Sequence, residues 1–139
     1  MKTIELTFDG YWLKDSETGI PSKSGIYCVY TCKYNENTNK VYICELIYIG
    51  ESSNVQDRIK NHDRLEDWEK EMKEGETLCY TFSPVSESDR ERAEAALIYY
   101  HKPKLNSEYK NSFPYCDTKI ELSGKARMLT PSFEVKRSN

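Results

Sequence analysis

The chain has 139 residues and a formal net charge of −3, with 37% hydrophobic and 31% charged residues. This length allows one domain with its own core, and no apolar run is long enough to span a bilayer. The N-terminal segment, MKTIELTFDGYW, alternates polar and apolar residues and lacks the apolar block of a signal peptide. We therefore expect a single-domain cytoplasmic protein with no membrane partner.

Strand signals dominate the first half of the chain. The segment KTIELTF predicts a peripheral N-terminal strand. Aromatic and β-branched residues then predict two strands, GIYCVYTC and VYICELIYIG, joined by the eight-residue loop KYNENTNK. A hairpin is the simplest arrangement of these two strands.

Two helices and a third strand follow. The segment ESSNVQDRIKNHDRLEDWEKEMK predicts one helix, with Asn54 as its N-cap and Gly75 beyond its end. TLCYTFSPV predicts a strand, and SDRERAEAALIYYHK predicts a second helix that opens with a capping box of Ser88 and Glu91. The predicted core face of that helix consists of Ala93, Ala96, Leu97 and Tyr100.

This order of elements predicts an α+β fold. We expect a small, mainly antiparallel three-stranded sheet flanked by helices, with a peripheral N-terminal strand and a C-terminal extension over residues 107–139. The segment between this strand and the extension is the predicted core.

Charge is unevenly distributed along the chain. Residues 101–139 carry eight Lys or Arg against four Asp or Glu, a net of +4, which leaves −7 for residues 1–100. Residues 63–76 alone hold seven acidic side chains against three basic ones. This pattern predicts a basic C-terminal segment and an acidic surface that cannot lie along a phosphate backbone, although both segments also fit ordinary solvated surface.

The five cysteines, at positions 28, 32, 44, 79 and 116, include no CxxC pair. An odd set with this spacing argues against a disulfide framework and against a zinc ribbon. Cys28 and Cys32 share a strand face and could pair as ligands, but small buried thiols are the alternative interpretation.

Several residues have side chains suited to phosphate chemistry. Arg58 and His62 are four apart on the first predicted helix, so one face would present a phosphate-binding guanidinium and a proton-carrying imidazole. Glu94 stands between alanines on the second helix, where it is either exposed or a ligand for Mg²⁺. Tyr27 and Tyr48 are either core residues or reactive phenols activated by a nearby cation.

The chain resembles the GIY-YIG nuclease superfamily. The two signatures occur as Gly25-Ile26-Tyr27 and Tyr48-Ile49-Gly50. Further positions that match the family pattern are Asn54, Val55, Arg58, His62, Glu94, Pro103 and Asn106. The resemblance covers roughly residues 21–106 and consists of five ordered blocks at compatible spacing.

The resemblance implies a metal-dependent endonuclease that cleaves phosphodiester bonds in nucleic acid, usually DNA. By this similarity Glu94 would bind Mg²⁺ or Mn²⁺, and Tyr27 would act as general base or orient the attacking water. Arg58 would stabilise the scissile phosphate, with Tyr48 and His62 supporting the phosphate and the proton transfers. The supporting positions would be Gly25, Gly50 and Asn106.

Two features depart from what such a nuclease needs. Glu51 directly follows the second signature, where a basic residue would suit a DNA-facing loop better. About 33 residues follow Asn106, without a zinc-finger or helix-turn-helix pattern. Nucleic acid would then approach from the sheet side and the basic C-terminal segment, with a homodimer or a protein partner supplying specificity. The alternative is a non-catalytic nucleic-acid-binding or adaptor module that retains this fold.

Overall fold

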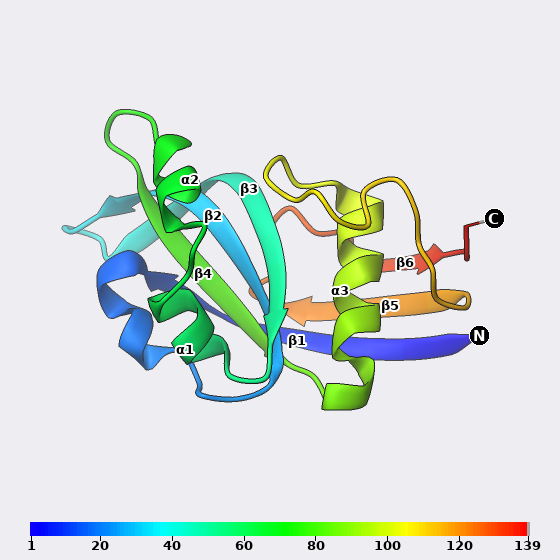
Figure 1. The fold of residues 1–139 in the computed structure, drawn as a ribbon. Helices are drawn as coiled ribbons and strands as arrows, with labels where there is room; N and C mark the ends of the chain where they lie inside the picture. Colours follow the sequence, from blue (N-terminus) through cyan, green and yellow to red (C-terminus); the bar gives the residue numbers. More distant parts are fainter. Residues whose placement is uncertain (139) are drawn as a thin grey trace.

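The computed structural model describes residues 1–138, which form one six-stranded mixed sheet and three α-helices (Figure 1). The strands lie in the order β3-β2-β4-β1-β5-β6. Their bounds are β1 Lys2–Leu13, β2 Gly25–Asn35, β3 Lys40–Ser52, β4 Thr77–Pro84, β5 Thr118–Gly124 and β6 Ser132–Val135. The helices are the 3-10 helix η1 Lys14–Gly19, α1 Val55–Lys60, α2 Leu65–Lys70 and α3 Glu87–His101.

The predicted three-stranded sheet is wrong, because the sheet has six strands and is not purely antiparallel. The N-terminal strand is not peripheral: β1 lies between β4, to which it is antiparallel, and β5, to which it is parallel. The residues predicted as an extension supply β5 and β6. β1 pairs with β5 because both strands alternate apolar residues, and Ile4 and Leu6 pair in register with Ile120 and Leu122.

The predicted hairpin of β2 and β3 is present, with a shorter loop than expected. The polar residues at both ends of the predicted loop continue the strand pairing. The register therefore runs from Gly25↔Ser52 to Asn35↔Lys40, and the loop is confined to residues 36–39. β2 also pairs with β4 along most of its length. Because β2 is covered on both faces and both edges, its first eight residues are buried.

The first predicted helix is divided in two. Asn54 caps α1 as expected, accepting a hydrogen bond from the Asp57 backbone N–H at 3.1 Å, but α1 ends at Lys60. His62 therefore lies outside the helix, and the prediction that it shares a helical face with Arg58 is wrong. A second short helix, α2, starts at Leu65.

The second predicted helix, α3, starts earlier than the sequence indicated. Its N-cap is Ser86, so the predicted capping box of Ser88 and Glu91 is wrong. The helix ends as expected before Pro103, with Lys102 in the left-handed conformation at φ 49°. Three of its predicted core residues are buried, whereas Tyr100 is 47% exposed.

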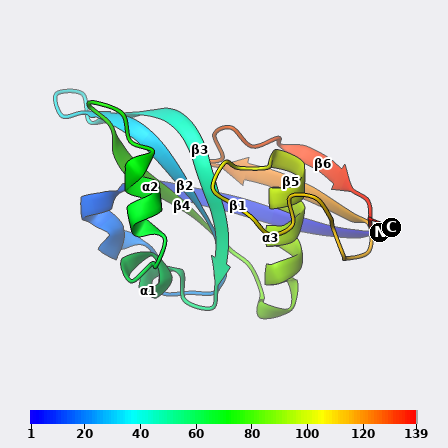
Figure 2. The same ribbon diagram turned by 45° about the horizontal axis from the view of Figure 1, so that its top comes forward.

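The helices cover opposite faces of the sheet, as Figures 1 and 2 show. Ile26 and Cys28 of β2 belong to the cluster that contains the buried side of α3, whereas Tyr27 and Val29 belong to the cluster with α1 and α2. This alternation follows from the two-residue period of a strand. No helix among residues 1–138 is both long enough and apolar enough to cross a membrane.

Candidate functional site

The two glycine-tyrosine signatures meet at one end of the β2–β3 hairpin. Tyr27 is the Cα partner of Gly50, and its ring lies over that glycine. A Cβ on Gly50 would lie 2.3 Å from the Tyr27 hydroxyl oxygen, so only glycine fits beneath this ring. A Cβ on Gly25 would lie 2.2 Å from the Ser83 carbonyl oxygen of β4. Both glycines therefore permit the close packing that positions Tyr27.

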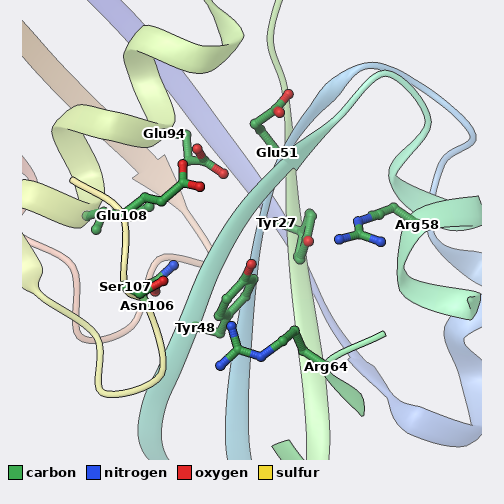
Figure 3. Close-up of a pocket in the computed structure, with 10 residues that line it drawn as sticks. Tyr27, Tyr48, Glu51, Arg58, Arg64, Glu94, Asn106, Ser107 and Glu108 are labelled. Carbon is green, nitrogen blue, oxygen red and sulfur yellow. The ribbon is translucent and has the colours of Figure 1, made fainter. Parts of the chain in front are cut away.

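Tyr27 is a buried phenol whose hydroxyl faces polar groups. Its hydroxyl oxygen lies 2.8 Å from Nε2 of His62, and Arg58 points toward its ring (Figure 3). Burial raises the pKa of Tyr27 far above its ordinary value, and the charge of Arg58 only partly opposes this effect. Tyr27 is therefore protonated at neutral pH.

His62 is buried and neutral. Burial, together with the nearby charge of Arg58, lowers its pKa to about 4. Its Nδ1 accepts a hydrogen bond from the Arg64 backbone N–H at 3.0 Å, so the proton of the neutral ring is on Nε2. Nε2–H then donates to the Tyr27 hydroxyl oxygen, which leaves the proton of Tyr27 free to donate elsewhere. The Asp63 carboxylate, 3.6 Å from Nδ1, forms no ion pair with a neutral ring.

Two arginines supply positive charge near the tyrosines. Arg58 of α1 is held by Asp63 at 3.0 Å and keeps its guanidinium partly exposed. Arg64, between α1 and α2, donates to Asp67 at 2.8 Å and to the Leu105 carbonyl at 3.0 Å. Its guanidinium carbon lies 5.6 Å from the centre of the Tyr48 ring, within the range of a cation–π contact. Sequence reasoning missed Arg64, because it stands in the acidic stretch and only the break between the two helices directs it inward.

Glu94 extends from α3 toward the same region (Figure 3). Its pKa is raised to about 8, first by burial and then by repulsion from the carboxylates of Glu51 and Glu108. Glu51 also forms an ion pair with Arg90 of α3. Glu51, which the sequence suggested was unsuited to the site, and Glu108, which it did not indicate, thus both belong to the surroundings of Glu94.

Asn106 secures the free edge of β3. Its side-chain oxygen accepts from the Ile49 N–H at 3.0 Å, and its side-chain nitrogen donates to the Ile49 carbonyl at 2.8 Å. The neighbouring Leu105 N–H donates to the Ile47 carbonyl at 3.0 Å. Asn106 therefore acts as an additional strand partner for the segment that carries Tyr48 and Gly50.

These residues surround one pocket of about 290 Å³. Five predicted site residues line it, namely Tyr27, Tyr48, Arg58, Glu94 and Asn106, together with five that were not predicted, namely Glu51, Arg64, Ile98, Ser107 and Glu108. His62 lies behind Tyr27 and does not line the pocket. Figure 3 shows the arginines on one side of β3 and the glutamates toward α3 on the other, so the pocket has a positive and a negative side.

The negative side suits a cation with few protein ligands. Among residues 1–138, no group of three or more His, Cys, Asp or Glu side chains is arranged to hold a metal ion. Mg²⁺ is nevertheless commonly bound by one or two carboxylates plus waters and substrate phosphate oxygens. Glu94 with one neighbouring carboxylate would fit that chemistry, since a cation would offset the carboxylate repulsion that, after burial, raises the pKa of Glu94.

No protein-family model, curated protein or solved structure matches this chain. The resemblance to the GIY-YIG nucleases therefore rests on the sequence motifs.

Proposed function

We propose that this protein is a metal-dependent endonuclease that hydrolyses phosphodiester bonds in nucleic acid, DNA in preference to RNA, in the cytoplasm. The observation that carries the proposal is the composition of the pocket. Two tyrosines from paired strands, two arginines and a partly buried glutamate come from four separate parts of the chain and share one cavity. Arginines beside a carboxylate-rich wall suit a phosphate diester approached by a cation.

The side chains have separable roles in this mechanism. Arg58 and Arg64 bind non-bridging phosphate oxygens, since a guanidinium can donate two parallel hydrogen bonds and stays charged at ordinary pH. His62 holds the Tyr27 oxygen through Nε2–H, so Tyr27 directs its own proton into the pocket. Tyr27 thereby orients the attacking water or a phosphate oxygen. Its high pKa favours this role over that of a general base.

Glu94 would hold Mg²⁺ or Mn²⁺, assisted by Glu108 or Glu51. The bound ion would supply Lewis-acid stabilisation of charge on the phosphate and the leaving oxygen. Asn106 and Gly50 keep the tyrosines in place and touch no reacting atom. Selection of a cleavage site would fall to a second copy of the chain or to a protein partner.

Cleavage of supercoiled plasmid and of branched DNA with Mg²⁺ or Mn²⁺ tests the proposal. We expect Glu94→Gln and Arg58→Ala each to reduce the rate at least about 100-fold, the usual cost of removing a charge-stabilising group. Matched controls are Glu87→Gln, exposed in the first turn of α3, and Arg127→Ala, exposed between β5 and β6. Equal activity in wild type and both site variants would contradict the proposal.

One observation favours a non-catalytic nucleic-acid-binding module instead. A carboxyl group with a pKa of about 8 is mostly protonated at pH 7, which weakens its affinity for a cation. Calorimetric titration with Mn²⁺ in the presence of a non-cleavable phosphodiester separates the two functions. Nucleic-acid binding without Mn²⁺ binding at millimolar concentration would favour the module.

A further inference from the structure

A second polar surface lies at the opposite end of the β2–β3 hairpin from the pocket. Two hollows, of about 620 and 380 Å³, lie against this hairpin and share Tyr34, Lys40 and Val41 in their walls. In Figure 1 the hairpin loop projects at the left end of the sheet, away from α3. We call this region the hairpin-tip surface, formed by Tyr11, Trp12, Lys33, Tyr34, Lys40, Tyr42 and Lys125.

Aromatic rings are unusually accessible at this surface. Tyr42 is 67% exposed and Tyr34 is 36% exposed. The Tyr34 hydroxyl donates to the side-chain oxygen of Asn39, a loop residue in the left-handed conformation at φ 56°. This hydrogen bond holds the Tyr34 ring in place before any ligand arrives. Tyr11 and Trp12 of β1 line the wall of the larger hollow.

The charged residues that line the two hollows are all lysines, although Glu36 of the hairpin loop is exposed nearby and Glu76 interacts with Lys33. Lys33, Lys40 and Lys125 line the hollows, and no carboxylate is among the lining residues. The contrast with the first pocket is clear, since three glutamates line that pocket. Lys125 also brings part of the basic C-terminal segment to this end of the sheet. In a chain of net charge −3, such a concentration of lysines beside open tyrosine rings indicates an anionic ligand with flat apolar parts.

We propose that the hairpin-tip surface binds a single-stranded stretch of nucleic acid. Exposed aromatic rings stack on unpaired bases of any sequence, and lysines neutralise the adjoining phosphates. A duplex keeps its bases stacked on one another and offers no free base face to these rings. The inference rests on the proposed nuclease function and names its substrate class: nucleic acid with an unpaired segment beside the cleaved bond.

The position of the surface suits this role. Lys33, the cross-strand partner of Tyr42, lies six residues along β2 from Tyr27, so both side chains are on the same face of the sheet and roughly 20 Å apart along the strand. A substrate strand that reaches both sites would gain affinity at the hairpin tip, where lysines attract it. The glutamates of the cleavage pocket repel phosphate unless a cation is present, so binding at the tip compensates for that repulsion.

The test measures binding without metal and separately from cleavage. Fluorescence anisotropy of a labelled oligothymidylate of about 20 nucleotides, in EDTA, compares wild type with Tyr42→Ala, Lys33→Gln and Lys40→Gln. We expect Tyr42→Ala to weaken binding about tenfold through loss of stacking. Each lysine variant should reduce the slope of log affinity against log salt by about 1. A duplex of equal length should bind more weakly and be insensitive to Tyr42→Ala.

Controls use matched side chains elsewhere on the surface. Tyr100, exposed on α3, and Lys136, exposed beyond β6, are replaced by Ala and Gln respectively. Absence of wild-type binding, an unchanged affinity in Tyr42→Ala, or equal losses in Tyr42→Ala and Tyr100→Ala would overturn the proposal. Tyr42-dependent binding without cleavage in Mg²⁺ would remove the nuclease function and leave the surface in place. Cleavage by the wild type, together with unaltered binding in Tyr42→Ala, would remove the proposed binding surface and leave the nuclease function in place.

Discussion

At the scale of single residues, three ionisable groups at the site, Tyr27, His62 and Glu94, are held in their neutral forms. Tyr27 and His62 are buried beside Arg58, and Glu94 is buried beside other carboxylates. Burial is the largest contribution to each shift, because it penalises whichever form is charged. In the absence of ligand the pocket therefore resists charging, and its titration should be measurable in stability and in metal binding.

Glu94 should make the free protein less stable as pH rises. Its folded-state pKa of about 8 exceeds its ordinary 4.5, so the folded state binds more protons than the unfolded state between these values. The contribution of this group to the free energy of unfolding is fully present below pH 4.5 and decreases by about 5 kcal/mol as the pH rises to about 8. In thermal unfolding without metal, the stability of Glu94→Gln relative to wild type should increase from pH 5 to pH 9. The control is the exposed Glu134→Gln. Parallel curves of stability against pH for wild type and Glu94→Gln would contradict this prediction.

Metal affinity should have the opposite pH dependence. A divalent cation binds the carboxylate and displaces its proton, so affinity for Mn²⁺ should rise about tenfold per pH unit below pH 8 and level off above it. Calorimetry in two buffers of different ionisation enthalpy counts the released proton directly. An affinity that does not change between pH 6 and 8 would exclude Glu94 as the ligand.

The two histidines should be opposite tautomers. In His62 Nδ1 accepts from the Arg64 N–H, so Nε2 carries the proton. In His101 Nε2 accepts from the Thr130 N–H at 2.9 Å, and Nδ1 donates to the Leu97 carbonyl at 2.9 Å. Nitrogen chemical shifts at pH 7 distinguish the two forms. Because the pKa of His62 is lowered to about 4, its signal should titrate only below pH 5, and its stabilising contribution should be lost as pH falls from 6.5 toward 4. The same tautomer in both rings would refute this assignment.

At the scale of elements, the site depends on how the edge of β3 is covered. Loop residues Leu105 and Asn106 bond to the backbone of Ile47 and Ile49, so an edge strand gains a partner that belongs to no strand. Such bonds satisfy backbone groups that would otherwise face the pocket. They also join the end of α3 to the hairpin, which connects the glutamate side of the pocket to the tyrosine side.

Replacing Asn106 tests this connection. Asn106→Ala removes both hydrogen bonds to Ile49 and leaves the backbone N–H and carbonyl of Ile49 without these protein partners. We expect a loss of about 2–3 kcal/mol in unfolding free energy and faster amide hydrogen exchange at Ile49. Asn106→Asp keeps the acceptor and loses the donor, so it should be intermediate in exchange. As a control, exposed Asn37→Ala in the hairpin loop should change neither quantity.

Local patterns predicted the elements well where the partner of a residue is close in sequence. Residue composition predicted strands β2, β3 and β4. Cap and proline signals predicted the Asn54 cap and the end of α3 at Lys102. The break after Lys60 was missed because apolar residues recur at helical spacing from Val55 through Ile59 to Leu65, which outweighed the low helix propensity of residues 61–63. Tertiary contacts of His62 and Trp68 decide where the chain turns. The same break places Arg64 in the pocket, so the position of Arg64 was missed together with the break.

At the scale of the whole molecule, the sheet joins the two ends of the chain. β1 and β5 are parallel partners more than a hundred residues apart, from Lys2↔Thr118 to Phe8↔Gly124. A parallel pair is not joined by a hairpin turn that the sequence could indicate, which is why the sequence suggested a peripheral strand and a C-terminal extension outside the core. Beneath this pair, Ile4, Leu6 and Phe8 form one core with Ile120 and Phe133.

Removing the C-terminal segment should therefore unfold the protein rather than trim it. A chain ending at Asn106 loses β5 and β6, which leaves one edge of β1 without a partner and exposes the apolar side chains of Ile4 and Phe8. We expect an aggregating or non-cooperatively unfolding product, whereas a chain ending at Val135 keeps all six strands and should unfold cooperatively. Because a truncated chain can fail for several reasons, Ile120→Ala provides a milder probe, with an expected loss of about 3 kcal/mol. Cooperative unfolding of the shorter chain near the wild-type midpoint, together with a neutral Ile120→Ala, would mean that residues 107–139 are an appendage after all. In that case the pocket would have to be held by the hairpin, β4 and α3 alone.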